Sequence, residues 1–392
     1  MLSKPLPDLR LEDIAALKTN GVAESRVIDF KSAAAGSSDR DKKEFLADVT
    51  AFANASGGDM VFGIETRDGL PSEVDGIELE DADKEILRLG DLIRSGAEPR
   101  LTYFDMVWIP ISGKRGVLVL RIPRSWTAPH RVTLQGHDKF YVRNSAGKHP
   151  MNVDELRHAF TLTEALIERV RRFRMERIDL ILNAEGPIAL QDGPKLMFHL
   201  APLSAFVDPP NLRFSADITT RLRPFGAGSW SHMHTLEGFA AYPGSSEEGI
   251  VRAYSLAFRN GVIEAVAALP VNEQNGVRSL SLNRVQNYVL ESWGPYFDIL
   301  RQHGVQPPVY AAISLIGVRG LAPVADVGLD LYGAQYRRDQ LILPELEITA
   351  AMSQTRPHIV MRPVFDILAN AFGLSRAGNY KADGNYAIDY TR

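Results

Sequence analysis

The chain has 392 residues, no cysteine, 23% charged residues and a formal net charge of −4. This length suggests two or three domains, and the absence of cysteine excludes disulfide-stabilised scaffolds and metal sites with Cys ligands. The charge argues against a wholly basic nucleic-acid coat protein, and no apolar run reaches the roughly 18 residues of a membrane helix, so we expect a cytoplasmic protein without a membrane partner.

A strand, a helix and a second strand are predicted near the start of the chain. Arg26–Lys31 is rich in β-branched and aromatic residues, which is typical of a strand. An apolar helix face begins near Asp41 and ends at Gly57-Gly58, and Met60–Ile64 is the next strand. The crossover predicts two parallel strands whose carboxyl ends meet at one edge of a sheet, where ligands bind in open α/β folds.

The segment from Arg100 to Lys148 is strongly basic. An acidic stretch, Glu73–Asp91, precedes it and predicts a solvated helix. The basic segment holds nine Lys or Arg residues against two Asp residues, and such an excess is typical of a surface that grips phosphates. Each of these charges taken singly is more typical of a solvated surface. We select as nucleic-acid contacts Arg121, Arg124, Arg131, Lys139 and Arg143.

A long helix over Asn152–Asn183 separates two halves of the chain. We predict an α/β (mixed α+β) protein with an N-terminal domain at 1–163, a helical linker at 164–187 and a separate α/β domain at 188–392. The second half predicts strands, a hairpin with an Asn-Gly turn and two helices: Leu196–Leu200, Val251–Ala268, Leu282–His303, Val309–Val318, Leu341–Ile348 and Val364–Phe372. Its apolar content suits a sensor for a trigger ligand or a homodimer module, but no motif in it names a ligand.

Three carboxylates bracket the first strand–helix–strand unit. Glu24 precedes the first strand, Asp29 lies in it and Glu65 follows the second, while Lys31 shares a strand face with Asp29. Carboxylates with a nearby lysine suit phosphodiester cleavage with Mg²⁺ or Mn²⁺, since oxygen ligands hold the ion and the ammonium stabilises the developing charge. Taken by spacing alone, solvated carboxylates at strand ends are the more economical interpretation.

Three motifs in order resemble the Schlafen/AlbA_2 domain family. They are residues 24–31 (Glu-Ser-Arg-Val-Ile-Asp-Phe-Lys), 51–58 (Ala-Phe-Ala-Asn-Ala-Ser-Gly-Gly) and 62–65 (Phe-Gly-Ile-Glu). The family pattern is Glu-Ser-x-x-Val-Glu-Phe-Lys, then Ala-Phe-Ala-Asn-x-x-Gly-Gly, then Gly-Val-Asp. Pro129-His130-Arg131 and residues 140–143 resemble later elements of the family. The resemblance spans about Leu11 to Phe160 and leaves out the C-terminal half.

The resemblance implies a metal-dependent endoribonuclease that cleaves structured RNA such as tRNA, in bacterial anti-phage defence or stress response. By motif position, Glu24, Asp29 and Glu65 would be the catalytic and metal-binding carboxylates, with Lys31 as a further catalytic residue. Asp29 stands where the family usually has Glu, and Glu65 where it usually has Asp. Each exchange keeps the charge and moves the carboxylate by one methylene. The alternative is a non-catalytic regulator that binds DNA or RNA. Many bacterial members of the family are described only as DNA-binding or transcription-related proteins.

Overall fold

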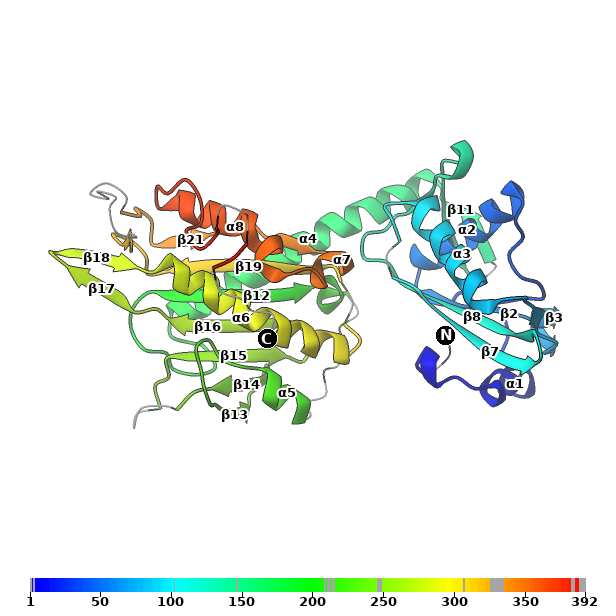
Figure 1. Cartoon of the computed structure of the whole chain (residues 1–392), viewed down its shortest axis with the longest axis horizontal. Helices are drawn as coiled ribbons and strands as arrows, with labels where there is room; N and C mark the ends of the chain where they lie inside the picture. Colours follow the sequence, from blue (N-terminus) through cyan, green and yellow to red (C-terminus); the bar gives the residue numbers. More distant parts are fainter. Residues whose placement is uncertain are drawn as a thin grey trace. The chain divides into compact units, whose positions relative to one another are not determined.

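The computed structural model describes all residues except 1, 3, 102, 146, 208, 210, 211, 213–215, 245–248, 306, 325–334, 382–384 and 388–392. The chain forms two compact units, Met1–Ala165 and Leu166–Arg392 (Figure 1). The predicted mixed α/β class is confirmed. Residues 166–187, which belong to the predicted helical linker, are part of the second unit. Within the described residues, no helix is long and apolar enough to cross a membrane.

The N-terminal unit is built on a mixed sheet with strand order β1-β2-β8-β5, in which β7 also pairs with β8. A smaller sheet has the order β11-β10-β9-β6, and β3 pairs with β4. The strands are β1 (Ile28–Lys31), β2 (Gly57–Phe62), β3 (Glu65–Arg67), β4 (Leu70–Glu73), β5 (Ile77–Glu78), β6 (Ala97–Glu98), β7 (Asp105–Ser112), β8 (Arg115–Pro123), β9 (Arg131–Val132), β10 (Lys139–Asn144) and β11 (Gly147–Pro150). The helices are η1 (Leu6–Asp8), α1 (Leu11–Thr19), α2 (Asp39–Ala53), α3 (Ala82–Gly96), η2 (Leu134–Gly136) and the start of α4 (Val153–Leu182).

The predicted crossover is confirmed, because β1 and β2 are parallel with Lys31 opposite Phe62. The connecting helix α2 starts after Ser38, whose hydroxyl accepts a hydrogen bond from the Asp41 amide at 3.2 Å and so satisfies one free donor of the first turn. At its other end the chain turns directly into β2 through Gly57, which has φ +71°. A Cβ at Gly57 would lie 2.5 Å from the Arg124 nitrogen, so only glycine fits.

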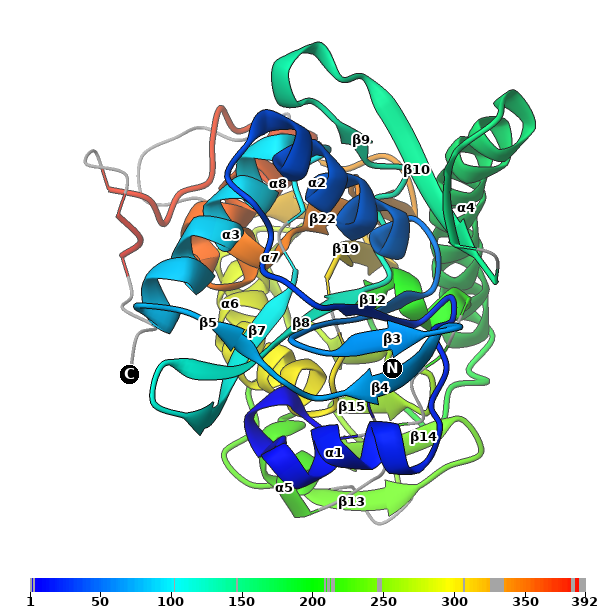
Figure 2. The ribbon, with the colours of Figure 1, turned by 90° about the vertical axis from the view of Figure 1, so that its right-hand side faces the viewer.

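The two faces of the main sheet carry separate apolar cores. On one face α2 and α3 pack against Met60 and Leu120, whereas α1 and η1 cover Val61 and Val119 on the other. Figure 2 shows α1 on the side of the sheet away from α2 and α3. Neighbouring residues of one strand thus enter different cores, as the pleat requires. This sandwich fixes both α2 and β1, the elements that line the pocket described below.

Asn54, just after α2, ties that helix to the smaller sheet. Its amide nitrogen donates to the carbonyl oxygens of His130 (2.9 Å) and Tyr141 (2.8 Å), and its Oδ1 accepts from the His130 amide at 2.7 Å. We expect Asn54→Ala to lower the free energy of unfolding of this unit by about 2–4 kcal/mol, since each lost bond is worth about 1 kcal/mol and buried partners are left unpaired. Denaturant unfolding measures this, with exposed Asn20→Ala as the control. A loss no larger than that of the control would contradict the bracing role.

His130 is fully buried in the same corner. Its Nδ1 faces the Pro99 carbonyl oxygen at 2.5 Å and its Nε2 faces the Ser125 hydroxyl at 2.6 Å. Because the carbonyl can only accept, Nδ1 carries the proton and Nε2 accepts from the hydroxyl in the neutral ring. Burial lowers the pKa of His130 to about 4, although the bond to the Pro99 carbonyl opposes this shift.

This shift predicts a pH-dependent stability of the N-terminal unit. The unfolded chain takes up the His130 proton near pH 6.5, about two and a half pH units before the folded chain. The contribution to stability is therefore complete above about pH 6.5 and is lost as the pH falls towards about 4. The expected loss is about 3 kcal/mol. We would compare denaturant unfolding of the wild type and His130→Gln between pH 7 and pH 4. If the free energy of unfolding depended on pH equally in the two proteins, this prediction would be contradicted.

The C-terminal unit is built on a sheet with strand order β13-β14-β15-β16-β12-β19-β21, in which β22 also pairs with β19. Its strands are β12 (Lys195–Pro202), β13 (Ser231–His234), β14 (Gly238–Tyr242), β15 (Ala253–Phe258), β16 (Ile263–Ala268), β17 (Val271–Gln274), β18 (Val277–Leu280), β19 (Val309–Ile316), β20 (Ala322–Pro323), β21 (Gln340–Ile342) and β22 (Leu346–Ile348). Its helices are the rest of α4, then η3 (Leu203–Phe206), α5 (Ala216–Arg221), α6 (Leu282–Gln302), α7 (Ala350–Ser353) and α8 (Pro357–Ala371).

The predicted hairpin and the long amphipathic helix are confirmed as β15–β16 and α6. The strand predicted at 341–348 is two short strands, β21 and β22, which both pair with β19. The helix predicted from Val364 begins earlier, at Pro357, because proline suits the first helical turn. One face of the large sheet packs against α6 and α8. The other carries buried polar residues that contact α4.

Arg177 of α4 lies at the centre of those polar contacts. Its guanidinium donates to both carboxylate oxygens of Glu264 at 2.8 and 2.9 Å. His199 and Tyr254 also contact this carboxylate, at 2.9 and 2.8 Å. Burial favours the neutral form of Glu264, but the hydrogen bonds of His199 and Arg177 outweigh it and lower the pKa of the carboxyl to about 2. One turn earlier, Arg174 is also buried and donates to Ser314 at 2.9 Å.

Candidate functional site

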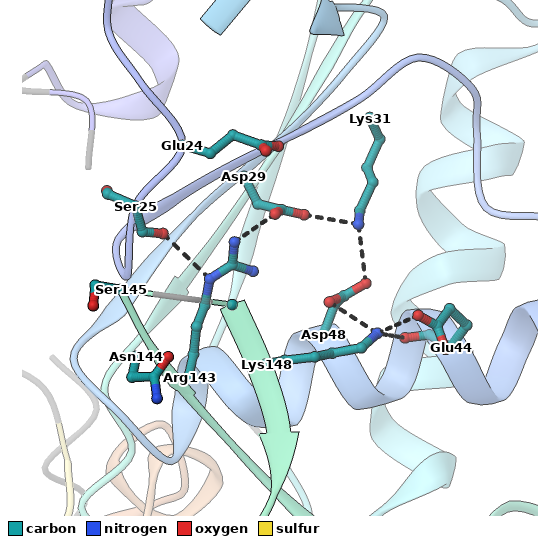
Figure 3. A pocket seen from close by; sticks show the side chains of 11 residues that line it. Glu24, Ser25, Asp29, Lys31, Glu44, Asp48, Arg143, Asn144, Ser145 and Lys148 are labelled. Atoms are coloured by element: carbon teal, nitrogen blue, oxygen red, sulfur yellow. Dashed lines mark hydrogen bonds and ion pairs between the residues drawn. The ribbon is translucent and has the colours of Figure 1, made fainter. Parts of the chain in front are cut away.

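A polar pocket of about 290 Å³ opens on the N-terminal unit. It lies among strand β1, helix α2 and the β10–β11 hairpin, and Figure 3 shows the charged side chains of these elements pointing towards one another. Charged lining residues come from each element. They are Glu24, Asp29, Lys31, Glu44, Asp48, Arg143 and Lys148.

Lys31 lies between two carboxylates. Its ammonium nitrogen is 2.9 Å from Asp29 Oδ2 and 3.2 Å from Asp48 Oδ2. Asp29 and Lys31 are two residues apart on β1 and so share a face, as predicted, while Asp48 reaches the same point from α2. Burial lowers the pKa of Lys31, but the charges of Asp48 and Asp29 outweigh burial and leave the pKa raised. Lys31 is therefore a cation throughout the physiological pH range.

Arg143 of β10 holds the other side of Asp29. Its Nη2 donates to Asp29 Oδ1 at 2.5 Å, and its Nε donates to the Ser25 carbonyl oxygen at 3.2 Å. The guanidinium also lies over the Phe52 ring, 4.5 Å from the centroid. Both partners of this ion pair are buried. Because a buried charge without its partner is costly, Arg143 and Asp29 orient each other.

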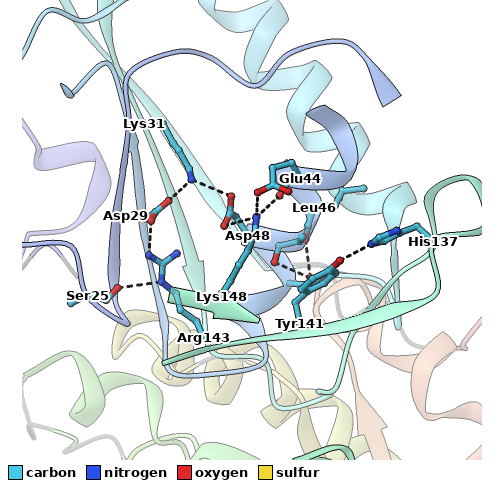
Figure 4. A network of polar contacts seen from close by, with 12 residues as sticks. Ser25, Asp29, Lys31, Glu44, Leu46, Asp48, His137, Tyr141, Arg143 and Lys148 are labelled. Atoms are coloured by element: carbon cyan, nitrogen blue, oxygen red, sulfur yellow. Dashed lines mark hydrogen bonds and ion pairs between the residues drawn. The ribbon is translucent and has the colours of Figure 1, made fainter. Parts of the chain in front are cut away.

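Lys148, opposite Arg143 in the β10–β11 hairpin, binds helix α2. Its ammonium contacts Glu44 Oε1 at 2.6 Å and Asp48 Oδ1 at 3.0 Å. The hydrogen bond from Lys148 lowers the pKa of Glu44. Figure 4 shows the resulting chain of alternating charges, which runs from Glu44 through Asp48 and Asp29 to Arg143. This series of ion pairs joins strand β1, helix α2 and the β10–β11 hairpin, which are far apart in the sequence.

The structure places two of the three predicted carboxylates at this pocket. Glu24 lines it, and Glu24 Oε1 also accepts a hydrogen bond from the Phe30 amide at 3.0 Å, which steadies β1. Asp29 lies at its centre. Glu65 is exposed at the start of β3 and is not among the residues lining the pocket. Although β1 and β2 are parallel, their pairing does not bring Glu65 among the residues that line this pocket.

The five predicted phosphate contacts lie in different surroundings. Arg121 binds Asp59 at 2.7 Å and the carbonyl oxygens of Leu2 and Lys4, so it anchors the start of the chain. Arg131 pairs with Glu98 at 2.5 Å, and Arg143 with Asp29. These three cations serve carboxylates of their own unit. Lys139 is exposed, and Arg124 lies over the Trp126 ring at 4.9 Å; phosphate binding by any of the five stays a prediction.

Sequence reasoning missed Asp48. It falls in an apolar stretch of α2 between Ala47 and Val49, and only 4% of it is exposed. An acidic residue on the buried face of an amphipathic helix is rare unless it is paired, and this was the available signal. Which cations pair with it could not be read from the sequence, because they come from β1 and β11.

The pocket fits a divalent cation in one respect. Asp29 Oδ2 is buried and accepts no hydrogen bond from the described residues; its contact there is the ion pair with the Lys31 ammonium at 2.9 Å. Mg²⁺ is commonly held by one or two carboxylates together with water and substrate phosphate, and Asp29 and Asp48 could supply those carboxylates. Across the described part of the chain, no three or more His, Cys, Asp or Glu residues group as a metal site. Metal binding by Glu24, Asp29 and Glu65 stays a prediction.

The comparison with protein families agrees with the motifs. Residues 24–152 match the Schlafen, AlbA_2 family. A crystal structure of the DIP2311 protein from Corynebacterium diphtheriae is similar at 19% identity and a TM-score of 0.26, over 36% of this chain and 26% of that one. The N-terminal domain of a protein from Nitrosomonas europaea described as related to the ATP-dependent DNA helicase RecG is similar at 24% identity and a TM-score of 0.22, over 29% of this chain and 70% of that one.

No curated protein matches the chain. The family match includes the three sequence motifs, the pocket and both strands of the β10–β11 hairpin. The predicted resemblance is therefore confirmed as a match of residues 24–152 to the Schlafen, AlbA_2 domain family.

Proposed function

We propose that the N-terminal unit binds nucleic acid and cleaves its phosphodiester backbone with a divalent metal, with structured RNA such as tRNA as the substrate. The observation that carries this proposal is the pair of carboxylates, Asp29 and Asp48, that face one ammonium group in an open polar pocket. The Schlafen, AlbA_2 match and the predicted basic segment support nucleic acid as the substrate class. A role in bacterial defence or stress response follows the family resemblance.

Asp29 and Asp48 would hold Mg²⁺ or Mn²⁺, with Glu24 beside them at the pocket wall. When bound, the metal would neutralise phosphate charge and lower the pKa of an attacking water or sugar hydroxyl. The Lys31 ammonium, which stays charged throughout the physiological pH range, would supply positive charge to the phosphate in the transition state, where such charges are most effective. Arg143 keeps Asp29 oriented through its buried ion pair. The proposed metal-binding carboxylates therefore include Asp48 in place of the predicted Glu65.

Outside the pocket, the phosphates of the nucleic-acid backbone would be bound by cations on the protein surface. Lys139 is exposed, and the Arg124 guanidinium lies over the ring of half-buried Trp126. Such surfaces stack on unpaired bases and contact phosphates. Lys139 and Arg124 are therefore the predicted contacts that we retain for RNA.

A second candidate function is a non-catalytic DNA- or RNA-binding regulator. The observation that favours it is the internal pairing of the pocket, where Arg143 and Lys31 both hold Asp29. In that case the charge chain would only stabilise the fold. This function predicts binding that weakens steeply with salt and that EDTA does not affect.

The test is incubation of the purified full chain with total tRNA and Mn²⁺ or Mg²⁺, read on a denaturing gel beside EDTA and Asp29→Asn controls. Asparagine is the better change here, because Asp29→Ala would leave Nη2 of buried Arg143 without its side-chain acceptor, whereas the amide oxygen of asparagine can still accept a hydrogen bond. Discrete fragments that vanish in both controls are expected. Intact RNA with a salt-sensitive shift on a native gel would support the regulator instead.

A further inference from the structure

Lys31 differs from the other two cations of the pocket in how it is held. Its side chain is 36% exposed, against 6% for Arg143 and 17% for Lys148. Arg143 has the Ser25 carbonyl and the Phe52 ring as further partners, and Lys148 has the Glu44 carbonyl at 3.2 Å. The ion pairs of Lys31 within the described chain are those with Asp29 and Asp48. Of these three cations, Lys31 therefore needs the least free energy to move out of its ion pairs.

The carboxylates remain in place when Lys31 moves. The side chains of Asp29 and Asp48 are 9% and 5% exposed, and each keeps a second basic partner, Arg143 and Lys148 respectively. The ammonium group thus approaches from the solvent side of two fixed carboxylates. Among the described residues, Asp29 Oδ2 accepts no hydrogen bond, so when Lys31 moves away this buried oxygen is left for another cation.

The charges of the pocket support an exchange of cations. The lining has four carboxylates, Glu24, Asp29, Glu44 and Asp48, and three basic groups, Lys31, Arg143 and Lys148. Without the Lys31 ammonium, two basic groups face four carboxylates, and the remaining charge of −2 equals that which one divalent cation neutralises. The displaced ammonium would then lie near the mouth of the pocket.

We infer that Lys31 is an internal substitute for the divalent cation: its ammonium occupies the space between Asp29 and Asp48, the metal displaces it, and the displaced ammonium contacts a substrate phosphate. This inference rests on the proposed function, because it uses the same pocket and substrate. It makes metal binding the event that prepares Lys31 for the substrate. The closed, lysine-bound state would keep the pocket inactive when metal is scarce.

The first experiment measures Mn²⁺ binding to the full chain without RNA, from the electron paramagnetic resonance of free Mn²⁺. Lys31→Met should bind Mn²⁺ about tenfold more tightly than the wild type, since the competing cation is gone, and Asp48→Asn about tenfold more weakly. Lys42→Met is the matched control, because Lys42 lies in the first turn of α2, its side chain is 33% exposed, and its ammonium is 3.9 Å from the Asp39 carboxylate. Equal or weaker Mn²⁺ binding by Lys31→Met, or no binding by either protein, would overturn the inference.

The second experiment uses the wild type alone, so it does not depend on how the variants fold. Lysine acylation, read by peptide mass spectrometry, should become several-fold faster at Lys31 when Mn²⁺ is added and return to its first rate with EDTA. Lys148 is the internal reference and should not change. Unchanged labelling of Lys31 at saturating Mn²⁺ would overturn the inference.

The two proposals fail in distinguishable ways. Neither experiment contains RNA, so cation exchange at Lys31 without any RNA cleavage would contradict the proposed function and leave the exchange established. Metal-dependent cleavage with no tighter Mn²⁺ binding by Lys31→Met would contradict only the exchange.

Discussion

Asp48→Asn is expected to lower the rate of RNA cleavage by about 100-fold or more. Asp48 supplies one of the two carboxylates that face the Lys31 ammonium, and only 4% of the residue is exposed. A metal ion contributes several kcal/mol of transition-state stabilisation, and about 1.4 kcal/mol corresponds to a tenfold change in rate. The measurement is a single-turnover time course with labelled tRNA and saturating Mn²⁺. Asparagine keeps the size of the side chain, so helix α2 can keep its packing.

Two variants serve as controls for Asp48→Asn. Asp39→Asn removes an exposed carboxylate from the first turn of the same helix and should leave cleavage unchanged. Glu65→Gln distinguishes the pocket from the motif: since Glu65 is exposed outside the pocket, we expect cleavage within about threefold of the wild type. Full activity of Asp48→Asn together with loss of activity in Glu65→Gln would assign the site to the motif carboxylates and contradict the pocket.

Arg177→Met is expected to destabilise the C-terminal unit by about 3–5 kcal/mol, because it leaves the carboxylate of Glu264 buried without its main counter-charge. Arg177 and Glu264 are 3% and 0% exposed, and two hydrogen bonds join them at 2.8 and 2.9 Å. His199 and Tyr254 remain near the carboxylate but supply no permanent charge. We would measure hydrogen exchange of peptides from β12 and β16, because the two units of the chain need not unfold together.

Arg172→Met is the matched control, since Arg172 is exposed on the same helix and its loss should change stability by no more than about 0.5 kcal/mol. The double variant Arg177→Met with Glu264→Gln should regain part of the lost stability, because a neutral amide needs no counter-charge. Wild-type exchange protection in Arg177→Met would show that the buried pair does not stabilise this unit.

Much of the N-terminal fold was predictable because its signals are local. The β-branched run before Lys31, the apolar face of α2 and the glycines at its end each describe a single element, and the crossover rule makes β1 and β2 parallel. The pleat also places Asp29 and Lys31 on one face, since residues two apart in a strand always share a side. The ends of helices and strands were less predictable: α8 begins at Pro357, whereas the sequence predicted a helix from Val364.

The sequence by itself determined the βαβ unit, the Schlafen-like motifs and the Asp29–Lys31 pair, because each depends on residues close together along the chain. Only the tertiary structure decided that Asp48 of α2 completes the pocket, that Glu65 lies outside it, and that Arg121, Arg131 and Arg143 serve carboxylates of their own unit. The physical reason is that a buried charge must find a counter-charge wherever packing brings one within reach. Those partners lie as far apart in the chain as Asp29 and Arg143, and no local pattern pairs them.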